Sequence, residues 1–242
     1  MDRKDAQSIL DGLLLGDANL DLGGGRSARF RLSRQASTEE GEEKVRDYLS
    51  SVVEALWTLG IELPAGQPMT RIQNGKTMLR VRSKSSPLLT DLYNRWFGPP
   101  GGPRRKVPEG LELTPLTLAH WFESDGSTTL EQGNLVRLVI RPCQFGREGN
   151  LKLQKLLESI GIKVRLRRSY DKRYNTECWY LVINDASTVN RFLDMVEPHI
   201  HPRYSDKVKR PWLKVLTVGG KRVRGKFVWR GGDWELAEKE GA

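Results

Sequence analysis

Two aspartates occupy matching positions in two short apolar segments of the chain. The segments read LDGLLLGDA (residues 10–18) and LAHWFESDG (residues 118–126), and they place Asp17 and Asp125 108 residues apart. Each segment is a run of apolar and small residues that predicts a helix of about two turns, which is too short to cross a membrane. If the two helices pack against each other along the small residues Gly12 and Gly16, their backbones come close together. The two carboxylates would then emerge side by side at the helix ends.

Such a pair of carboxylates has a characteristic chemistry. The two charges repel each other and lie at the negative ends of two helix dipoles, so the arrangement favours a bound cation. Divalent ions that prefer oxygen ligands meet this requirement, Mg²⁺ above all. Mn²⁺ is the alternative ion. A metal site of this kind is suited to activating water against a phosphodiester. The alternative is that both segments are core helices whose aspartates are solvated caps.

The paired motifs resemble those of the LAGLIDADG homing endonucleases, in the single-chain branch that carries two motifs. The eighth motif position supplies the metal-binding acid of each half in that family, and Asp17 and Asp125 stand there. The LTPL sequence before the second copy (residues 113–116) is also similar, and the resemblance runs from about residue 8 to about residue 207. It implies an α+β (mixed α/β) fold of two pseudosymmetric αββαββα repeats, with antiparallel saddle-shaped sheets packed through the two motif helices.

The same resemblance implies further site residues. Polar side chains at the end of the second strand of each unit match Gln35 and Gln144, and a lysine after the last helix matches Lys207 in HPRYSDK. Their expected task is to orient the attacking water and to offset the charge that develops on the phosphate. The backbone carbonyls of Ala18 and Gly126 are expected as additional metal ligands. For the glutamines and the lysine, ordinary surface polarity remains the alternative.

The charge of the chain points to a polyanionic partner. Forty Lys and Arg against thirty Asp and Glu give a net charge of +10 and a pI of about 9.7, which supplies the counterion-release contribution to nucleic-acid binding. Four predicted strands alternate apolar and basic residues, so each presents a basic row on one face. An antiparallel sheet of this kind can pack one face on helices and lay the other along double-stranded DNA. The predicted DNA-binding residues are Arg29, Arg31, Arg80, Arg82, Lys84, Arg137, Arg141, Lys163, Arg165 and Arg167.

The order of predicted elements is that of a duplicated unit. The first half has a helix near 6–17, two strands, a helix over 38–59, two more strands and a helix over 87–97. The second half has helices over 114–124, 147–160 and 186–197, with strands within 126–141, 162–170 and 177–184. We therefore divide the chain into a first repeat (1–97), a linker rich in Pro, Gly and Arg (98–113), a second repeat (114–200) and a basic tail (201–242).

The tail has an unusual composition. Residues 201–230 contain ten Lys or Arg and one acid, Asp206. Gly219-Gly220 predicts a turn between strands over 213–218 and 221–228. This basic hairpin either lengthens the DNA contact or packs on the core. Elsewhere, Cys143 and Cys178 have no metal-ligand spacing and are expected to stay reduced without forming a disulfide.

These observations predict a monomeric, site-specific endonuclease that cuts both strands of a long, nearly asymmetric DNA site, as expected for intron homing. Each aspartate is expected to serve mainly one strand. Two alternatives remain, a DNA-binding regulator that does not cut and an intron maturase that binds intron RNA. The chain has no signal peptide and no apolar run of membrane-spanning length, so we expect a soluble, non-secreted protein of the cytoplasm or an organellar matrix.

Overall fold

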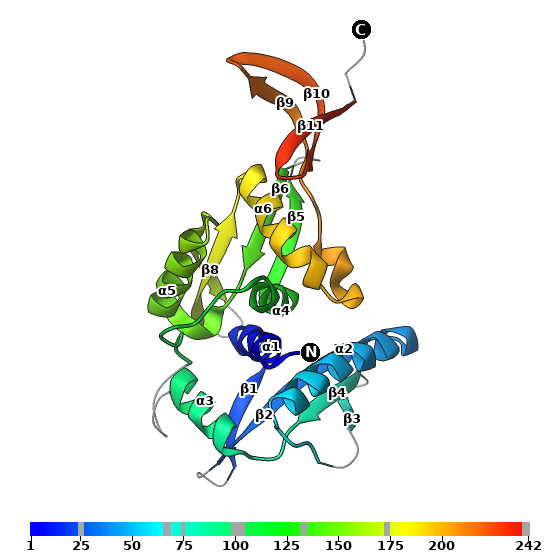
Figure 1. Ribbon diagram of the computed structural model, residues 1–242, viewed down its shortest axis with the longest axis vertical. Helices are drawn as coiled ribbons and strands as arrows, with labels where there is room; N and C mark the ends of the chain where they lie inside the picture. Colours follow the sequence, from blue (N-terminus) through cyan, green and yellow to red (C-terminus); the bar gives the residue numbers. More distant parts are fainter. Residues whose placement is uncertain are drawn as a thin grey trace.

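The chain folds into two units with the same order of elements and a third, smaller sheet at the C-terminal end (Figure 1). The computed structural model describes residues 1–23, 27–64, 69–73, 76–97, 105–131, 135–171 and 175–238. The first unit comprises α1 (Arg3–Leu15), β1 (Asn19–Gly23), β2 (Ser27–Ala36), α2 (Glu39–Thr58), β3 (Met69–Gln73), β4 (Lys76–Arg82) and α3 (Pro87–Phe97). The second comprises α4 (Pro115–Asp125), β5 (Gly126–Glu131), β6 (Leu135–Ile140), α5 (Gly146–Ser159), β7 (Arg165–Asp171), β8 (Thr176–Ile183) and α6 (Ala186–Val196).

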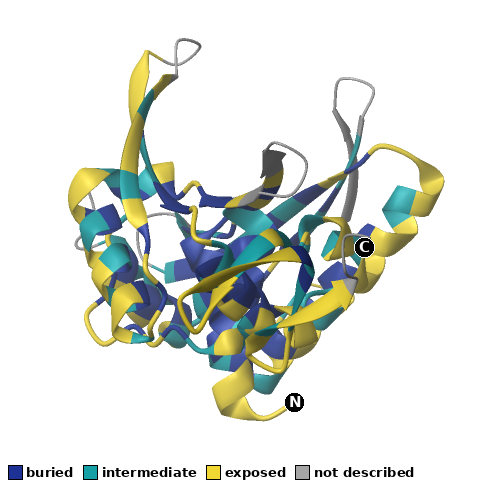
Figure 2. Cartoon of the chain, turned by 90° about the horizontal axis from the view of Figure 1, so that it is seen from above, coloured by how far each residue is buried: buried dark blue, intermediate teal, exposed yellow. Residues whose placement is uncertain are grey.

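The two four-stranded sheets share one topology. Their strand orders are β1-β2-β4-β3 and β5-β6-β8-β7, and neighbouring strands are antiparallel throughout. This confirms the predicted α+β class with αββαββα units. Figure 2 shows the buried residues gathered mainly in the helical layer beneath the strands, with exposed residues along the strand ends. Each sheet therefore packs one face on helices and leaves the other accessible.

Side-chain caps fix where three of the helices begin. Thr38 accepts a hydrogen bond from the Gly41 backbone N–H at the start of α2. Thr114 does the same for α4, where Pro115 occupies the first turn, and Asp185 caps α6. These residues satisfy backbone donors that have no partner inside the helix. The start of α4 is thus specified locally, and Asp125 follows as its last residue.

Helices α1 and α4 pack directly against each other at the centre of the molecule (Figure 1). A Cβ placed on Gly12 would lie 2.5 Å from the carbonyl oxygen of Thr117, and one placed on Gly16 would lie 2.2 Å from the Cβ of Ser124. Only glycine fits at these two positions, because any side chain would have to push the helices apart. The predicted close approach along Gly12 and Gly16 is present.

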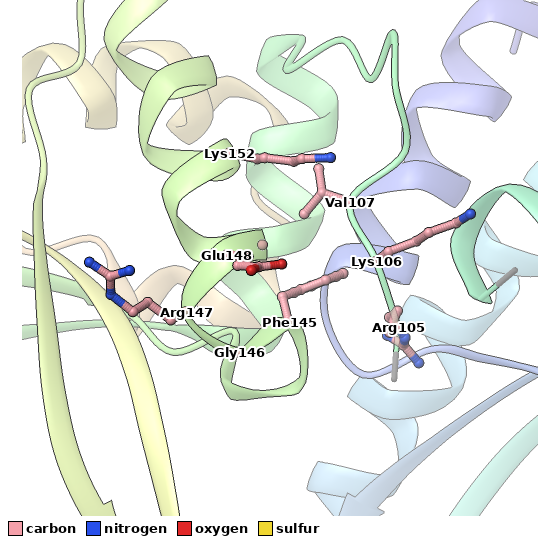
Figure 3. Close-up of a pocket in the computed structure, with 9 residues that line it drawn as sticks. Arg105, Lys106, Val107, Phe145, Gly146, Arg147, Glu148 and Lys152 are labelled. Carbon is pink, nitrogen blue, oxygen red and sulfur yellow. The ribbon is translucent and has the colours of Figure 1, made fainter. Parts of the chain in front are cut away.

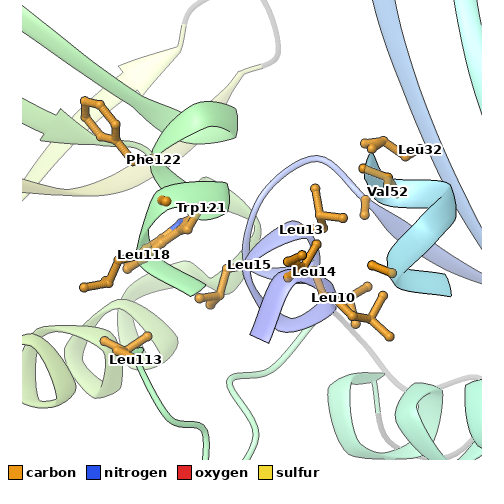
Figure 4. Packing of buried hydrophobic residues seen from close by; sticks show 14 of the residues in the cluster. Leu10, Leu13, Leu14, Leu15, Leu32, Val52, Leu113, Leu118, Trp121 and Phe122 are labelled. Carbon is orange, nitrogen blue, oxygen red and sulfur yellow. The ribbon is translucent and has the colours of Figure 1, made fainter. Parts of the chain in front are cut away.

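The apolar core continues from this seam into both units. Figure 4 shows Leu15 of α1 directed toward Leu118 and Trp121 of α4, and Leu13 directed toward Val52 of α2. All five side chains are buried to 1% exposure or less. Burial of leucine, valine and tryptophan side chains from both units in one cluster provides most of the stabilising apolar area. The core thereby holds the two helix ends in a fixed relation.

The tail forms a three-stranded antiparallel sheet with the order β11-β10-β9. Strands β9 (Leu213–Val218) and β10 (Lys221–Arg230) are the two that the Gly-Gly turn predicts. Strand β11 (Asp233–Glu238) was not predicted from the sequence. No helix in the described parts of the chain is long and apolar enough to span a bilayer.

The expectation that both cysteines stay reduced is wrong for this structure. Cys143, in the short helix η1 (Cys143–Phe145), is joined by a disulfide to Cys178 of β8. The two Cα atoms are 4.8 Å apart, within the range that a disulfide requires. The sequence could not reveal this proximity, because it depends on how η1 folds back against a strand 35 residues further along the chain.

Candidate catalytic site and nucleic-acid face

Asp17 lies just beyond the C-terminal end of α1 and is paired with a buried arginine. The helix ends at Leu15 with Gly16 as its cap, so Asp17 stands outside the helix rather than within its last turn. The Arg34 guanidinium, 8% exposed, donates from Nη1 to Asp17 Oδ2 at 2.5 Å, while half of the Asp17 side chain remains exposed. Arg34 also donates from Nη2 to the Ser124 hydroxyl at 2.8 Å. One cation thus bridges the ends of both motif helices.

Asp125 is the last residue of α4 and has a different environment. Burial and the negative charge of Asp17 together raise its pKa to about 7, against the opposing effects of the Gln144 amide, the Trp121 indole and the charge of Arg105. The effect of the Asp17 charge on Asp125 places the two carboxylates in one electrostatic site. Asp125 therefore changes its charge near neutral pH.

A cation from outside the motif helices caps the C-terminal end of each. For α1 this cation is Arg105, which donates to the carbonyls of Leu14, Gly16 and Ala18 at 2.7, 3.0 and 2.7 Å. For α4 it is Lys207, whose Nζ donates to the Glu123 carbonyl at 2.7 Å. Positive charge at a helix C-terminus satisfies free carbonyls and complements the helix dipole. Arg105 follows α3 and Lys207 follows α6, and these are the last α-helices of the two units. The two cations therefore hold related positions in the two units.

The predicted polar residues occupy unequal positions around the acids. Gln144 donates from Nε2 to the Leu15 carbonyl at 2.7 Å and lies 3.5 Å from Asp125 Oδ2. Burial, and then the positive charge of Arg34, lower the pKa of Lys207, which also senses both acids. Gln35, by contrast, has an exposed side chain, and its backbone carbonyl accepts a hydrogen bond from Arg203. The structure brings Gln144 and Lys207 to the acids but not Gln35.

The backbone carbonyls of Ala18 and Gly126, predicted as metal ligands, are less favourably placed for a metal than the two carboxylates. The Ala18 carbonyl accepts the Arg105 hydrogen bond, so it already has a strong donor. Gly126 begins β5 opposite Ile140. Within the described residues there is no group of three or more His, Cys, Asp or Glu side chains that could hold a metal ion. Any metal at this site would take ligands besides the two carboxylates from water and substrate.

Three residues of the site were missed in the sequence, and one of them carried a signal. Phe30 and Leu32 alternate inward along β2, and Arg34 continues the same parity onto the buried face. An arginine at an inward position of a strand predicts a partner that accepts its hydrogen bonds, and here that partner is Asp17. Nothing in the sequence marks Arg105 or Ser124, whose roles depend on the path of the linker and on the crossing of α1 and α4.

A separate pocket of about 330 Å³ lies beside the α1 cap, between residues 105–107 and the start of α5 (Figure 3). Its charged lining is mostly basic, with Arg105, Lys106, Arg147 and Lys152 against Glu148. Neither of the two aspartates lines it. The acids therefore belong to an open site at the helix ends and not to this pocket.

In the first sheet, four predicted DNA-binding arginines share the face that points away from the helices. Arg31 lies opposite Arg82, and Arg80 lies opposite Ser33 and donates to its hydroxyl at 3.0 Å. Arg29 shares their parity on β2. Arg31 is partly neutralised by Asp21 at 3.3 Å. Like charges directly opposite each other are unfavourable unless an anion lies over them. Lys84 differs, because it follows β4 and pairs with Glu62 at 2.7 Å.

The second sheet presents a sparser basic row. Arg165 and Arg167 of β7 lie opposite Val182 and Tyr180, with exposed side chains. The Arg141 guanidinium lies 4.9 Å from the Tyr180 ring centre. Arg137 contacts Asn184, and Lys163 is exposed just before β7 begins. Both sheets thus carry cations on the face away from the helices, and this face of the first sheet has the denser cluster.

Comparison with known proteins identifies relatives of the whole arrangement. Residues 7–189, about three quarters of the chain, match the family model described as the LAGLIDADG DNA endonuclease family. An uncharacterized protein of Methanocaldococcus jannaschii, MJ1098, is 28% identical over 228 residues, covering 89% of this chain and 79% of that protein.

Solved structures share the fold. The homing endonuclease I-WcaI bound to its DNA recognition sequence superposes with a TM-score of 0.61 at 18% identity, covering 86% of this chain and 87% of that one. Variants of the homing endonuclease I-DmoI give a TM-score of 0.50 at 16% identity, covering 80% and 96%. At these identities the likeness is one of fold.

Proposed function

Because the chain belongs to the LAGLIDADG DNA endonuclease family, we propose that it is a site-specific endonuclease that depends on Mg²⁺ or Mn²⁺. It binds a long, nearly asymmetric double-stranded DNA target as a monomer and hydrolyses one phosphodiester in each strand. The observation that supports this most directly is the convergence of Asp17 and Asp125 at the ends of two packed helices, where the charge of Asp17 raises the pKa of Asp125.

The donor set fits a divalent cation that is completed by substrate. Mg²⁺ is usually bound through one or two carboxylates, with waters and substrate phosphates filling the remaining positions. Asp17 and Asp125 provide two such carboxylates, and their mutual repulsion is relieved by a cation between them. The chemistry that a bound Mg²⁺ or Mn²⁺ supplies is activation of water and neutralisation of charge on the phosphate.

The residues of the chain then have distinct tasks. Asp17 and Asp125 bind the cation, and each directs attack on mainly one strand. Gln144 lies beside Asp125 and is placed to orient a water by hydrogen bonding. Lys207 and Arg34 hold positive charge near both acids, where it offsets the negative charge that develops on the phosphate. The arginines of the two sheets bind the DNA backbone on either side of the cut.

One observation favours a second candidate function. Arg34 already neutralises Asp17, so the first acid has a protein cation as its partner. A protein that binds DNA without cutting it needs no metal at this position, and the same sheet faces would serve a regulator. For catalysis, by contrast, Arg34 must exchange Asp17 for the phosphate when DNA and metal arrive.

A cleavage assay on a plasmid library with randomised inserts separates the candidates, because it does not require the target to be known. The purified protein is incubated with Mg²⁺ or with EDTA, and the linear products are recovered and their ends sequenced. Metal-dependent ends at one recurring sequence support the nuclease. Retarded migration with no new ends supports the regulator, and faster splicing of an intron RNA supports a maturase.

The matched controls use the same chemical change at two places. The Asp17→Asn/Asp125→Asn double variant is expected to bind DNA and give no recurring ends. Asp91→Asn, an exposed carboxylate on α3, is expected to cut like the wild-type protein. Cutting by the double variant would show that a contaminating nuclease, or another site, is responsible.

A further inference from the structure

The part of the chain after the family match is dense in positively charged side chains. Between residues 207 and 232 there are nine Lys or Arg and no Asp or Glu. The family model ends at residue 189, so this charge is a property of the present chain and not of the matched repeats. Its arrangement on the tail sheet decides what it can contact.

The root of the tail sheet is held against α6. Trp229 Nε1 donates to Asp194 at 2.7 Å, and Trp234 Nε1 donates to the Ser187 hydroxyl at 3.0 Å. Arg210 pairs with Asp194 at 2.8 Å, and Phe227 is 4% exposed. The aromatic residues of the tail therefore pack on the second unit, which gives the sheet a fixed base.

The other end of the sheet is a two-stranded ribbon. Strand β11 pairs with residues 226–230 of β10 only, so β9 and the first part of β10 form a hairpin without a third strand. Its tip is Gly219-Gly220, with φ of 55° and 78°, the left-handed conformation that a tight two-residue hairpin turn requires. Figure 1 shows this ribbon extending beyond the second unit along the longest axis of the molecule.

The ribbon carries cations on both faces. The register pairs Arg222 with Thr217 and Arg224 with Val215, which places the two arginines on one face. Lys221, opposite Val218, lies on the other face, which it shares with Lys214 by strand alternation. All four cationic side chains are exposed, and Val218 and Val223 are 56% and 38% exposed. An exposed hairpin of this length is marginal in water by itself.

We propose that the β9–β10 ribbon is a second DNA-binding element, which binds duplex DNA flanking the target on the side of the second unit. A two-stranded ribbon fits the major groove of B-form DNA, and cations on both of its faces reach the phosphates of both groove walls. Double-stranded DNA is the occupant favoured by the complete lack of acids in this stretch and by the DNA-directed family of the repeats. The proposal rests on DNA binding by the chain, but not on cleavage.

The test compares two quadruple variants that remove the same charge. The ribbon variant carries Lys214→Gln, Lys221→Gln, Arg222→Gln and Arg224→Gln. The control variant carries Arg3→Gln, Arg46→Gln, Lys152→Gln and Lys155→Gln, all on helices. Equilibrium binding to duplex DNA is measured at several salt concentrations with Ca²⁺ in place of Mg²⁺, and circular dichroism verifies that both variants are folded.

Each phosphate contact contributes about 0.9 to the slope of log Kobs against log salt concentration. The ribbon variant is expected to reduce the magnitude of this slope by about 2 to 4, and the control variant by less than about 1. With the target in hand, hydroxyl-radical footprinting is expected to lose protection on one flank only. A variant that keeps the charge, with Lys214→Arg and Lys221→Arg, should retain the wild-type slope.

Equal slopes and footprints for the ribbon and control variants would overturn the proposal, as would a wild-type chain that does not bind DNA. Loss of binding to a structured RNA with an unchanged DNA slope would assign the ribbon to RNA instead. A change in oligomeric state without a change in slope would assign it to contact between copies of the chain. Wild-type binding without cutting, with the slope difference intact, contradicts only the nuclease function.

Discussion

The ends of α1 and α4 are built on one plan but differ in charge. Each motif helix ends near an aspartate, and each end is capped by a cation from another segment, Arg105 for α1 and Lys207 for α4. The nearest side-chain partner of the acid differs. Asp17 pairs with a buried guanidinium, whereas Asp125 faces the neutral amide of Gln144. The two helix ends thus share a backbone plan and differ in the charge that lies beside the acid.

This difference means that the two acids are not equivalent reagents. Asp17 is bound by a permanent cation, the Arg34 guanidinium. Asp125 has no such ion pair, and burial, followed by the negative charge of Asp17, raises its pKa to about 7. A metal ion at this site would therefore compete with Arg34 at Asp17 and with a proton at Asp125. The two strands of a DNA target would be cut under different local conditions.

The largest expected effect comes from removing either acid. Asp17→Asn and Asp125→Asn should each slow linearisation of a target plasmid by at least about a thousandfold, because several kcal/mol of metal-dependent stabilisation are lost. Each variant should leave nicked circles, since the remaining acid serves the other strand. Gel analysis of supercoiled plasmid measures both steps, and unchanged linearisation by either variant would contradict the assigned roles.

The same two variants are also expected to differ in thermal stability, because the two acids have different surroundings. Asp17→Asn leaves the buried Arg34 without its anionic partner, which is unfavourable. Asp125→Asn relieves repulsion of Asp17, and the nearby Arg105 keeps its hydrogen bonds to the carbonyls at the end of α1. The midpoint of thermal unfolding in EDTA is therefore expected to be lower for Asp17→Asn than for Asp125→Asn. The reverse order would show that the Arg34 ion pair contributes nothing to the fold.

A second prediction concerns the seam, where α1 contributes glycines and α4 contributes larger side chains. In Gly12→Ala the new Cβ would lie 2.5 Å from the Thr117 carbonyl oxygen, which is a backbone atom. The helices must separate, so urea denaturation should show a loss of about 1–3 kcal/mol.

Gly41→Ala on α2 is the matched control for this substitution. Its Cβ would meet only the Thr38 side-chain oxygen at 3.1 Å, so it should be neutral or stabilise the protein by up to about 1 kcal/mol. A similar outcome for the two variants would mean that the seam is not tightly packed.

Particular residues show how far the sequence predicts this structure. The two repeats, the order of helices and strands along each, and the close approach at Gly12 and Gly16 follow from apolar spacing and small residues, which are local signals. The burial of Arg34 can also be predicted from the sequence, because strand alternation places Arg34 on the same face as Phe30 and Leu32. The sequence prediction used only the outward-facing Arg29 and Arg31 of β2 and gave Arg34 no role.

The remaining features depend on tertiary paths that no local pattern encodes. Arg105 caps α1 because of how the linker returns to the seam, and Cys143 meets Cys178 because η1 lies on β8. Strand β11 contains acidic residues and one tryptophan, and it forms by pairing with β10. Gln35 was predicted as a site residue because it resembles the family's polar residue at the end of the second strand. At a strand end, a shift of one residue moves a side chain to the other face of the sheet.

A third prediction tests whether Arg34 competes with metal at Asp17. Replacing one contacting unit charge near the surface changes the electrostatic energy by about 1–3 kcal/mol. Arg34→Met should therefore raise the affinity of the DNA-free protein for Tb³⁺ or Ca²⁺ by about ten- to a hundredfold. Terbium luminescence or calorimetry measures it without any cleavage.

Arg82→Met, an exposed arginine of β4, is the control for the loss of net charge. It should change the affinity for metal by much less than Arg34→Met. Equal affinities for the wild-type protein and Arg34→Met would mean that the guanidinium does not occupy the cation position.

The smallest expected effect is the pH dependence that Asp125 gives to stability. An aspartate in the unfolded chain has a pKa of about 4, and folding raises that of Asp125 to about 7. Between these values the folded state holds a proton that the unfolded state releases, so the free energy of unfolding falls as the pH rises. Asp11, whose pKa burial raises to about 6, acts in the same direction.

Asp125→Asn removes one of these contributions and leaves that of Asp11 in place. The stability of the variant relative to wild type should therefore increase by about 1 kcal/mol between about pH 5 and about pH 8, a value reduced for solvent screening at the open site. Urea denaturation in EDTA measures this difference, and Asp91→Asn controls for the loss of a surface carboxylate. A difference that stays constant with pH would mean that Asp125 is no more protonated at neutral pH than an aspartate in water, and the two helix ends would then be electrostatically alike.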